Sequence, residues 1–424
     1  MWTDLLLAAG AALAAAFVAV IVANLVMVQR GIEYEISKVP ALDSSDFLRL
    51  MKGLTSLQLR SGNQIRLLLN GQEAFPAMFD AVQGAEQSVT FENYVYWSGK
   101  VGRHFARLLA DKANEGVRVH VVLDWVGSLS MDRESLKSME AAGVEVHRYH
   151  SPRFGGMHLL NHRTHRRELV IDGRVAFTGG IGFGDKWSGD GESTDNWRDN
   201  HYEVHGPVVG DIQAAFLDNW LKTSGNILVG DDYFPDLESR GKHLAGILCS
   251  SPTERATSGR LLILMLVAGA NATIRIEQAY FIADKHLRHA LVEAAERGVE
   301  VEILLPGKHI DIGVVRRASR MSWKRLLQAG VRIYEYQPTM LHVKAMVVDD
   351  QWVVAGSANL DFRSLYRNDE IYLVVRDHQF ARQHVDAFTN DKQHAAEITL
   401  ADWKKRPVAQ RLVDGAASLL RTQL

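Results

Sequence analysis

The sequence of this 424-residue chain contains an internal repeat, and the repeat constrains the fold more than any other feature. Three segments of the first half return in the same order in the second half. The matching pairs are residues 91–96 with 276–281, 116–123 with 298–305, and 142–146 with 329–333. Each pair is offset by roughly 185 residues, and a near-constant offset over three segments indicates a duplicated domain.

Within each half, amphipathic helices alternate with short apolar strands. Residues 101–114 show helical spacing of apolar side chains, and Gly116 ends that helix before a β-branched strand. Residues 287–297 repeat the pattern before Gly298. This alternation predicts a largely parallel sheet that helices cover on both faces. We therefore expect an α/β fold of two α/β/α sandwich domains related by a pseudo-two-fold axis, with any shared site on that axis.

The chain begins with an apolar segment. Residues 5–28 contain one polar residue, Asn24, and as a helix would be about 36 Å long, enough to cross the ~30 Å hydrocarbon core of a bilayer. The basic region that opens a cleaved signal peptide is missing, and a buried core helix rarely lacks a polar face over this length. We expect an uncleaved, single-pass transmembrane helix rather than either alternative.

Four regions follow from the repeat and the apolar segment. They are an anchor at residues 1–30, a polar connector at 31–60, a first domain at 61–235, and a second domain with a basic tail at 236–424. Residues 261–268 are apolar but too short to cross a bilayer, so they predict a buried helix. Residues 403–406 (WKKR) fit either a bilayer interface or an ordinary solvated tail.

Charge and cysteine content exclude several classes of protein. The 48 basic and 50 acidic residues give a net charge of −2, which argues against a nucleic-acid binder held by overall positive charge. The single cysteine, Cys249, excludes an intrachain disulfide, a cysteine-based zinc site and an iron–sulfur cluster.

Two histidines occupy matching places in the repeat, each followed by a cation two residues later and an aspartate seven residues later. The residues are His165, Arg167 and Asp172 in the first half, and His342, Lys344 and Asp349 in the second. In a strand, residues i and i+2 point to one face, so each histidine shares a pocket with its cation. Two imidazoles and two cations suit attack on a phosphodiester: one imidazole attacks phosphorus, the other protonates the leaving alcohol, and the cations neutralise the non-bridging oxygens. This chemistry requires neither metal nor cofactor.

These motifs resemble the signature of the phospholipase D superfamily, in which His-x-Lys-(x)4-Asp occurs twice. Within the superfamily, the sequence is more similar to the bacterial cardiolipin synthases. The segments that carry this resemblance are 332–338 (RIYEYQP), 341–344 (LHVK), 356–364 (GSANLDFRS), 197–199 (WRD), 206–207 (GP) and 278–281 (QAYF). The resemblance extends from about residue 91 to residue 403.

The resemblance implies double displacement through a phosphohistidine, with His165 as the nucleophile and His342 as general acid and then base. One phosphatidylglycerol donates its phosphatidyl group to another, and glycerol leaves. Together with the apolar segment, we expect a single-pass protein of the bacterial inner membrane with phospholipid and bilayer as partners. It has no cofactor, metal or nucleic-acid partner, and its oligomeric state stays open.

The resemblance also implies roles for further residues. Lys344, Ser357 and Asn359 match phosphate-binding positions of the family. Glu370 matches an acid that orients the histidine of its own half, and Asp199 is the candidate for that role in the first half. Asp172 and Asp349 are expected to be structural, each paired with local basic or backbone groups.

The first half departs from the family pattern at three positions. Arg167 stands where lysine is usual, and Gly180 and Gly182 match Ser357 and Asn359, so two side-chain donors are absent. Arginine keeps the charge, and backbone amides of the glycine-rich turn would replace the donors. We expect an altered but active site, with a non-catalytic first half as the alternative.

Four functions remain in competition. A phosphatidyltransferase that makes cardiolipin leads, and a phospholipase D that hydrolyses phosphatidyl lipids to phosphatidic acid shares every catalytic residue with it. A nuclease is disfavoured by the apolar segment and the near-neutral charge. A lipid-binding protein with a decayed first site is opposed by the intact His165 and Asp172.

Overall fold

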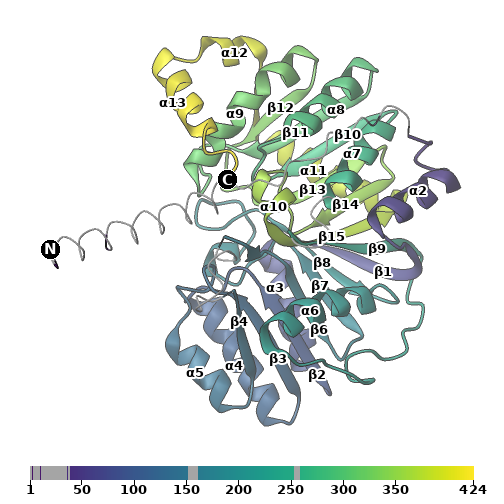
Figure 1. Ribbon diagram of the computed structural model, residues 1–424, viewed down its shortest axis with the longest axis vertical. Coiled ribbons are helices and arrows are strands. Elements are labelled where there is room, and N and C mark those ends of the chain that lie inside the picture. Colours follow the sequence, from purple (N-terminus) through teal and green to yellow (C-terminus); the bar gives the residue numbers. More distant parts are fainter. Residues whose placement is uncertain (1, 3–9, 11–35, 37–38, 151–160, 253–257) are drawn as a thin grey trace.

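The computed structural model describes residues 2, 10, 36, 39–150, 161–252 and 258–424 of the chain (Figure 1). The segment expected to anchor the protein, residues 5–28, lies outside the described residues apart from Gly10. Among the helices of the described part, none combines the length and the apolar composition that a membrane crossing requires.

The described strands form one mixed sheet of sixteen strands that runs through both halves of the chain (Figure 1). In the first half the spatial order is β1 (Arg60–Leu69), β8 (Asn200–His205), β7 (Val175–Gly179), β6 (Arg167–Ile171), β2 (Ser88–Asn93), β3 (Arg118–Asp124) and β4 (Glu145–Tyr149). In the second half it is β9 (His243–Ser250), β15 (Asn368–Arg376), β14 (Trp352–Gly356), β13 (Lys344–Val348), β10 (Thr273–Gln278), β11 (Glu300–Pro306), β12 (Arg332–Tyr336) and β16 (Ala395–Ile398). The two orders match strand for strand up to β12, so the sequence repeat is also a repeat of topology.

The halves are joined by backbone pairing and by a shared core. β1 and β9 pair antiparallel, with Arg60 opposite Ala245 and Asn63 opposite His243. β5 (Arg163–Thr164), a short strand of the first half, pairs with β15 of the second. One cluster of buried apolar side chains contains residues of both halves. The region where the halves meet is therefore packed protein interior.

The expectation of a largely parallel sheet is wrong. Within the described residues, β2–β3–β4, β10–β11–β12 and the short β5–β15 pair run parallel, and the other neighbouring strands are antiparallel. The reason is local, because tight hairpins join β6 to β7 and β13 to β14. Asp172 and Asp349 lie in these two hairpin turns at φ values of 52° and 51°.

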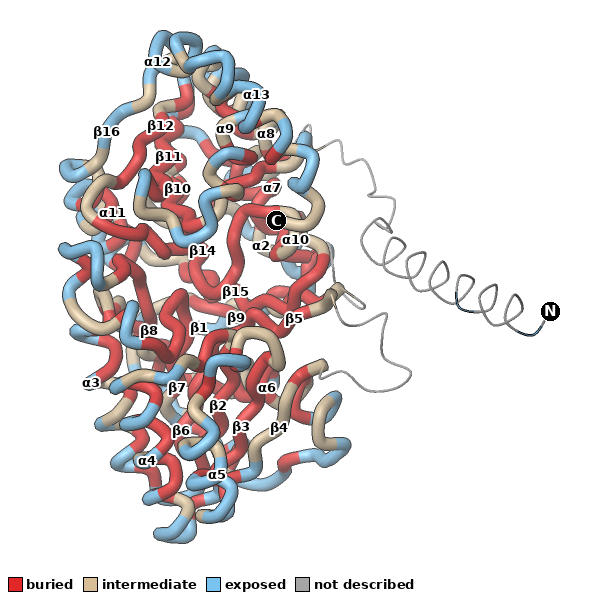
Figure 2. Tube along the Cα trace, turned by 90° about the vertical axis from the view of Figure 1, so that its left-hand side faces the viewer, coloured by how far each residue is buried: buried red, intermediate tan, exposed pale blue. Residues whose placement is uncertain are grey.

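Helices cover both faces of the sheet, and the strands between them are mostly buried (Figures 1 and 2). In the first half, α3 (Asn70–Gln83), α4 (Lys100–Asn114) and α5 (Arg133–Ala141) contribute to one core cluster and α6 (Val209–Ser224) to others. In the second half, α7 (Ser258–Gly269), α8 (Lys285–Glu296) and α9 (Gly313–Gln328) share one cluster, and α11 (His378–Gln393) packs into another. α2 (Ser45–Thr55), from the connector, packs into the first of these clusters. Shorter elements are η2 (Asp185–Trp187), α10 (Phe362–Tyr366), α12 (Leu400–Lys405) and α13 (Val408–Ser418).

The helices expected at residues 101–114 and 287–297 are present as α4 and α8, and the expected buried helix is α7. Gly116 and Gly298 follow α4 and α8 at φ values of 96° and 93°, a conformation that residues with a Cβ rarely adopt. In the basic segment 403–406, the Trp403 indole donates a hydrogen bond to the Arg320 carbonyl of α9 at 3.0 Å, so this ring packs against the protein.

Candidate active site

Asp172 and Asp349 lie outside the site and fix the backbone around it. The Asp172 carboxylate accepts hydrogen bonds from the amides of residues 86–88 at 2.7–3.3 Å. The Asp349 carboxylate accepts from the amides of residues 271–273 at 2.8–2.9 Å. These bonds hold the starts of β2 and β10 beside β6 and β13, the strands that begin with the motif cations. The two aspartates are therefore structural in this arrangement.

His165 and His342 both lie where the halves meet. The His165 amide follows β5 and donates to the Asp369 carbonyl of β15 at 2.9 Å. The His342 amide donates to the Arg198 carbonyl of the first half at 2.7 Å. Backbone hydrogen bonds thus fix each histidine to the opposite half, and both residues are buried, with 7% and 4% of their surface exposed.

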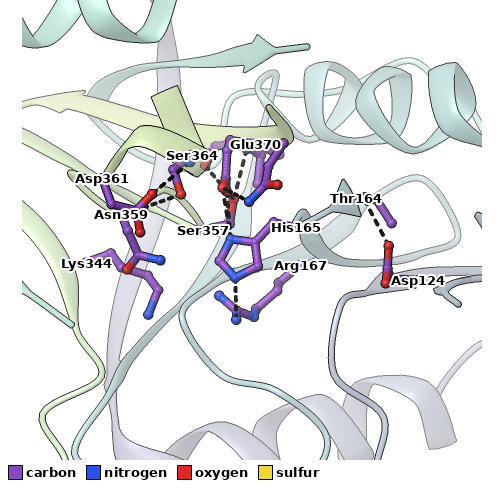
Figure 3. A network of polar contacts seen from close by, with 12 residues as sticks. Asp124, Thr164, His165, Arg167, Lys344, Ser357, Asn359, Asp361, Ser364 and Glu370 are labelled. Atoms are coloured by element: carbon purple, nitrogen blue, oxygen red, sulfur yellow. Dashed lines mark hydrogen bonds and ion pairs between the residues drawn. The ribbon is translucent and has the colours of Figure 1, made fainter. Parts of the chain in front are cut away.

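An acid and a cation contact opposite sides of the His165 ring (Figure 3). Nδ1 lies 3.0 Å from both carboxylate oxygens of Glu370, and Arg167 Nη2 lies 3.1 Å from Nε2. The Ser357 hydroxyl donates to the same carboxylate. A carboxylate at Nδ1 favours the tautomer with its proton there, which leaves the lone pair on Nε2, the nitrogen that faces Arg167.

His342 has a matching environment. Its Nδ1 lies 2.7 Å from Asp199 Oδ2, and Lys344 Nζ lies 3.0 and 3.2 Å from its two ring nitrogens. The indole of Trp187 donates to the same Asp199 oxygen at 2.9 Å. The rings of Trp187 and Trp197 each lie 5.3 Å from the imidazole, so two large apolar surfaces shield it from water.

The pairing of acids with histidines differs from the expectation. Glu370 contacts His165, and Asp199 contacts His342, so each acid orients the histidine of the other half. The physical reason is the backbone pairing at the junction. The strand before His165, β5, pairs with β15, which carries Glu370. The residue before His342 pairs with the residue before Asp199.

The two glycines of the first half make room for this arrangement. A Cβ at Gly180 would fall 2.0 Å from Asp199 Oδ1, and a Cβ at Gly182 would fall 2.9 Å from Val95 Cβ. The Asp199 carboxylate accepts from the Trp187 indole and from the Asn200 amide at 2.9 Å. The amide that bonds Asp199 belongs to Asn200 at the start of β8 and not to the glycine-rich turn, as had been expected. The indole takes the place of the missing serine hydroxyl. The role of Trp187 was not predicted from the sequence, because the repeat places no matching residue in the second half.

Several buried polar groups in the site have no hydrogen-bond partner among the described residues. They include Arg167 Nε, Arg167 Nη1 and Asn359 Oδ1. Asn359 lies next to Lys344 in the close-up view (Figure 3). Such groups cost free energy unless a ligand satisfies them, and guanidinium N–H groups suit an anion. Ser357 instead uses its hydroxyl to hold Glu370 and to accept from the Ile371 amide at 3.0 Å.

Burial controls the protonation of the histidines. It lowers the pKa of His165 to about 4, against the opposing effect of Glu370, and lowers that of His342 to about 3, with Lys344 adding to the effect. Both imidazoles are therefore neutral at pH 7. Burial alone would raise the pKa of Glu370 and of Asp199, but the contacting histidine and further partners more than offset it, so both pKa values lie below the ordinary range.

The two cations differ in how firmly they keep their charge. Burial lowers the pKa of Lys344 to about 7, although Asp199 opposes the shift. Arg167 is as deeply buried, yet a guanidinium stays charged in proteins. The charge of Arg167 lowers the pKa of His342, and that of Lys344 lowers the pKa of His165, so the two motifs act on one shared space. Within the described residues, no cluster of histidine, cysteine and acidic side chains is arranged to hold a metal ion.

Comparisons with known proteins identify the family of the chain. Residues 263–392 match the sequence profile described as "Cardiolipin synthase, PLD-like domain". The chain is 32% identical to cardiolipin synthase 2 of Bacillus anthracis over 375 residues, covering 88% of this chain and 73% of that protein. It is 34% identical to cardiolipin synthase A of Pseudomonas putida (strain W619) over 372 residues, covering 86% and 76%.

Solved structures resemble the fold. The crystal structure of phosphatidylserine synthase from Haemophilus influenzae Rd KW20 superposes with a TM-score of 0.70 at 15% identity, covering 89% of this chain and 99% of that one. Polyphosphate kinase from Porphyromonas gingivalis gives a TM-score of 0.54 at 13% identity, covering 92% of this chain and 57% of that one. At these identities the likeness concerns the fold alone.

Proposed function

The chain belongs to the cardiolipin synthases of the phospholipase D superfamily, and from this premise we propose that it makes cardiolipin by moving a phosphatidyl group from one phosphatidylglycerol to another. It is an enzyme of that superfamily and a phosphatidyltransferase. The observation that carries the proposal is the buried pair of histidines at the junction, each held between a carboxylate and a cation.

In the first step, His165 Nε2 attacks the phosphorus of the donor lipid. A nitrogen–phosphorus bond forms, the bond from phosphorus to the glycerol headgroup oxygen breaks, and His342 gives that oxygen a proton. A bound phosphodiester brings negative charge against His342, which favours the protonated imidazole that this step needs. The products are a phosphatidyl-histidine and free glycerol.

In the second step, a primary hydroxyl of another phosphatidylglycerol attacks the same phosphorus. His342, now neutral, accepts the hydroxyl proton, and the nitrogen–phosphorus bond breaks. Cardiolipin leaves, and His165 returns to its starting form. Glu370 and Asp199 keep each imidazole in one orientation throughout, because each accepts a hydrogen bond from Nδ1–H.

Arg167 and Lys344 serve the non-bridging oxygens of the phosphate. Two buried nitrogens of the Arg167 guanidinium without a partner in the described part of the chain support this role. Fixed cations in a site that excludes water stabilise the charge that develops as the new bond forms. We assign Asn359, beside Lys344, to the same phosphate, and Ser357 to the support of Glu370.

Hydrolysis to phosphatidic acid is the second candidate, because water in place of the acceptor lipid opens the same intermediate. The relatives favour the transferase. A decayed first site is disfavoured because each histidine, including His165, lies between a carboxylate and a cation. The near-neutral net charge gives no support to a nuclease.

A lipid assay tests the proposal. The purified protein is incubated in detergent–lipid micelles with labelled phosphatidylglycerol, with EDTA and without added metal. Cardiolipin together with glycerol is the expected result. Phosphatidic acid as the product would replace the transferase with a phospholipase D, and strong inhibition by EDTA would contradict a mechanism without metal.

We also propose residues 5–28 as a single membrane-spanning anchor in the bacterial inner membrane, on the strength of their apolar composition. In the same proposal, residues 61–235 and 236–424 form two α/β/α domains related by a pseudo-two-fold axis; the matching strand orders support it. A variant that lacks residues 1–38 is expected to leave the membrane fraction in part, and unchanged fractionation would contradict the anchor.

A further inference from the structure

Two arginines outside the reacting centre lie close to it. Arg163 is in β5, two residues before His165, and Arg363 is in α10, at the start of the segment that leads to Glu370. β5 pairs with β15 so that Arg163 lies opposite Asn368. The same strand pairing that fixes His165 therefore brings these two residues, far apart in the sequence, to one side of the site.

Arg163 is a buried cation with incomplete compensation. The residue is 9% exposed, and its Nη1 has no hydrogen-bond partner among the described residues. Its guanidinium lies over the Trp125 ring at 5.2 Å, and Asp124 is 3.9 Å from Nη1, beyond hydrogen-bond distance. Asp124 already accepts from three backbone amides, at 2.9, 3.1 and 3.3 Å. A buried guanidinium in this state favours an anionic ligand.

Arg363 is bonded to neutral groups. Its Nη1 donates to the Asn161 side-chain oxygen and its Nη2 to the Asn161 carbonyl, each at 2.9 Å. These bonds hold the guanidinium in place without neutralising it. The two arginines also act on one another, because the charge of Arg363 contributes to lowering the pKa of Arg163, after the larger effect of burial. An anion between them would relieve that repulsion.

Tyr94 connects the arginines to the reacting centre. Its ring meets the His165 ring edge to face at a centroid distance of 5.0 Å. Burial and the charge of Asp124 raise the pKa of the Tyr94 hydroxyl, and the charges of Arg363, Arg163 and Arg167 lower it, so all three cations act on this side chain. The structure gives no contact of Arg163 or Arg363 with either catalytic histidine. They border the site rather than form it.

We propose that Arg163 and Arg363 form a second anion subsite that binds the phosphodiester of the acceptor lipid. The inference rests on the proposed function. An acceptor phosphatidylglycerol carries its own phosphate, joined to the attacking hydroxyl by a three-carbon glycerol, so its anion must lie beside the first one. Water and simple alcohols lack this anion. The subsite therefore favours the acceptor lipid over water at the phosphatidyl-histidine.

The test measures how the intermediate is divided among acceptors. Wild type, Arg163→Gln and Arg363→Gln receive labelled phosphatidylglycerol in micelles with 1-butanol, and cardiolipin, phosphatidic acid and phosphatidylbutanol are quantified. Because a lost charge-assisted contact weakens binding by roughly tenfold or more, each variant should lose cardiolipin by that factor. The yields of phosphatidylbutanol and phosphatidic acid should stay within about twofold of wild type, once the donor lipid that is no longer converted to cardiolipin is taken into account.

Arg107→Gln is the matched control, since Arg107 is exposed on α4, and it should leave all three products unchanged. An equal loss of all three products in the subsite variants would overturn the inference, since it would place the arginines in the fold or the reacting centre. An unchanged product ratio would overturn it as well. If wild type forms phosphatidylbutanol but no cardiolipin, the proposed function itself fails, which is a different outcome.

Discussion

In the first half, the acid Asp199 receives a hydrogen bond from the indole of Trp187, whereas in the second half Glu370 receives one from the hydroxyl of Ser357. The supporting strands and hairpins match. The donor differs because Gly180 gives Asp199 the space that a serine at that position would fill. Each half therefore supplies one acid, one imidazole and one cation, but the group that donates a hydrogen bond to the acid differs between the halves.

The cations differ as well. Arg167 stands in the first half and Lys344 in the second, and burial lowers the pKa of Lys344 to about 7. A guanidinium keeps its charge under the same burial. The first half thus supplies a permanent cation, and the second supplies one that depends on pH. Substitutions in each half test whether the halves are equal in chemistry although unlike in detail.

The largest effect is expected from removal of either histidine. His165→Ala and His342→Ala should each lower turnover by a factor on the order of 10⁴ or more, because each performs a step that no other group replaces. Turnover of labelled phosphatidylglycerol measures this. Near-wild-type activity in His165→Ala would mean that the first half is not catalytic and that two histidines are not required.

A smaller loss is expected from the acids. Glu370→Gln and Asp199→Asn should each lower kcat by roughly 10–100-fold with little change in KM, because an amide does not fix the tautomer of the histidine in the same way. The reciprocal pairing adds a sharper readout: Glu370→Gln should slow formation of the covalent intermediate on His165 directly. An effect on the intermediate only from Asp199→Asn would contradict the observed pairing.

Substitutions that make the two halves alike should lower stability and activity. Gly180→Ser places a Cβ within 2.0 Å of the Asp199 carboxylate, so we expect a loss of stability of about 1–3 kcal/mol and lower activity. Thermal unfolding and turnover measure the two effects. The reverse change, Ser357→Gly, removes one hydrogen bond to Glu370 and should cost about 1 kcal/mol. A Gly180→Ser variant as stable and active as wild type would show that the acid has room to move.

The pH dependence should report Lys344. This side chain is charged below its pKa of about 7 and neutral above it, so kcat/KM should fall as the pH rises through that value. Lys344→Arg should extend activity to higher pH, since the guanidinium keeps its charge. Coinciding profiles for wild type and variant between pH 6 and 9 would assign the alkaline limb to another group.

The smallest effect is expected from Arg167→Lys, which keeps a cation at the position. Activity should stay within about threefold of wild type or rise, because the ammonium still neutralises the phosphate oxygens. Turnover should be measured at pH 6, where the new lysine is charged. A complete loss would show that the first pocket requires the guanidinium and its contact with His165 Nε2.

Much of this arrangement could be predicted from the sequence. The repeat predicted the duplicated strand order, and the spacing after His165 and His342 identified both histidines and their cations. These features are local, or repeat at a fixed offset. The hairpins that make the sheet mostly antiparallel were missed, because alternation of helices and strands does not report the direction of each strand.

The contact of each acid with the histidine of the other half could not be predicted from the sequence. Which histidine Asp199 or Glu370 meets depends on the β5–β15 pairing and on the bridge between Arg198 and Leu341, both of which join distant parts of the chain. Trp187 was missed for a related reason. It lies in η2, within an irregular segment where the repeat gives no matching residue.

The central claim is that His165 carries the phosphatidyl group while His342 moves protons. Wild type mixed with labelled donor lipid, quenched in alkali within the first turnover and mapped by mass spectrometry, tests it directly. The account predicts an adduct on His165 that is absent from His165→Ala. An adduct on His342 instead would reverse the roles of the two halves, and transfer to acceptor with no adduct on either histidine would contradict the double displacement.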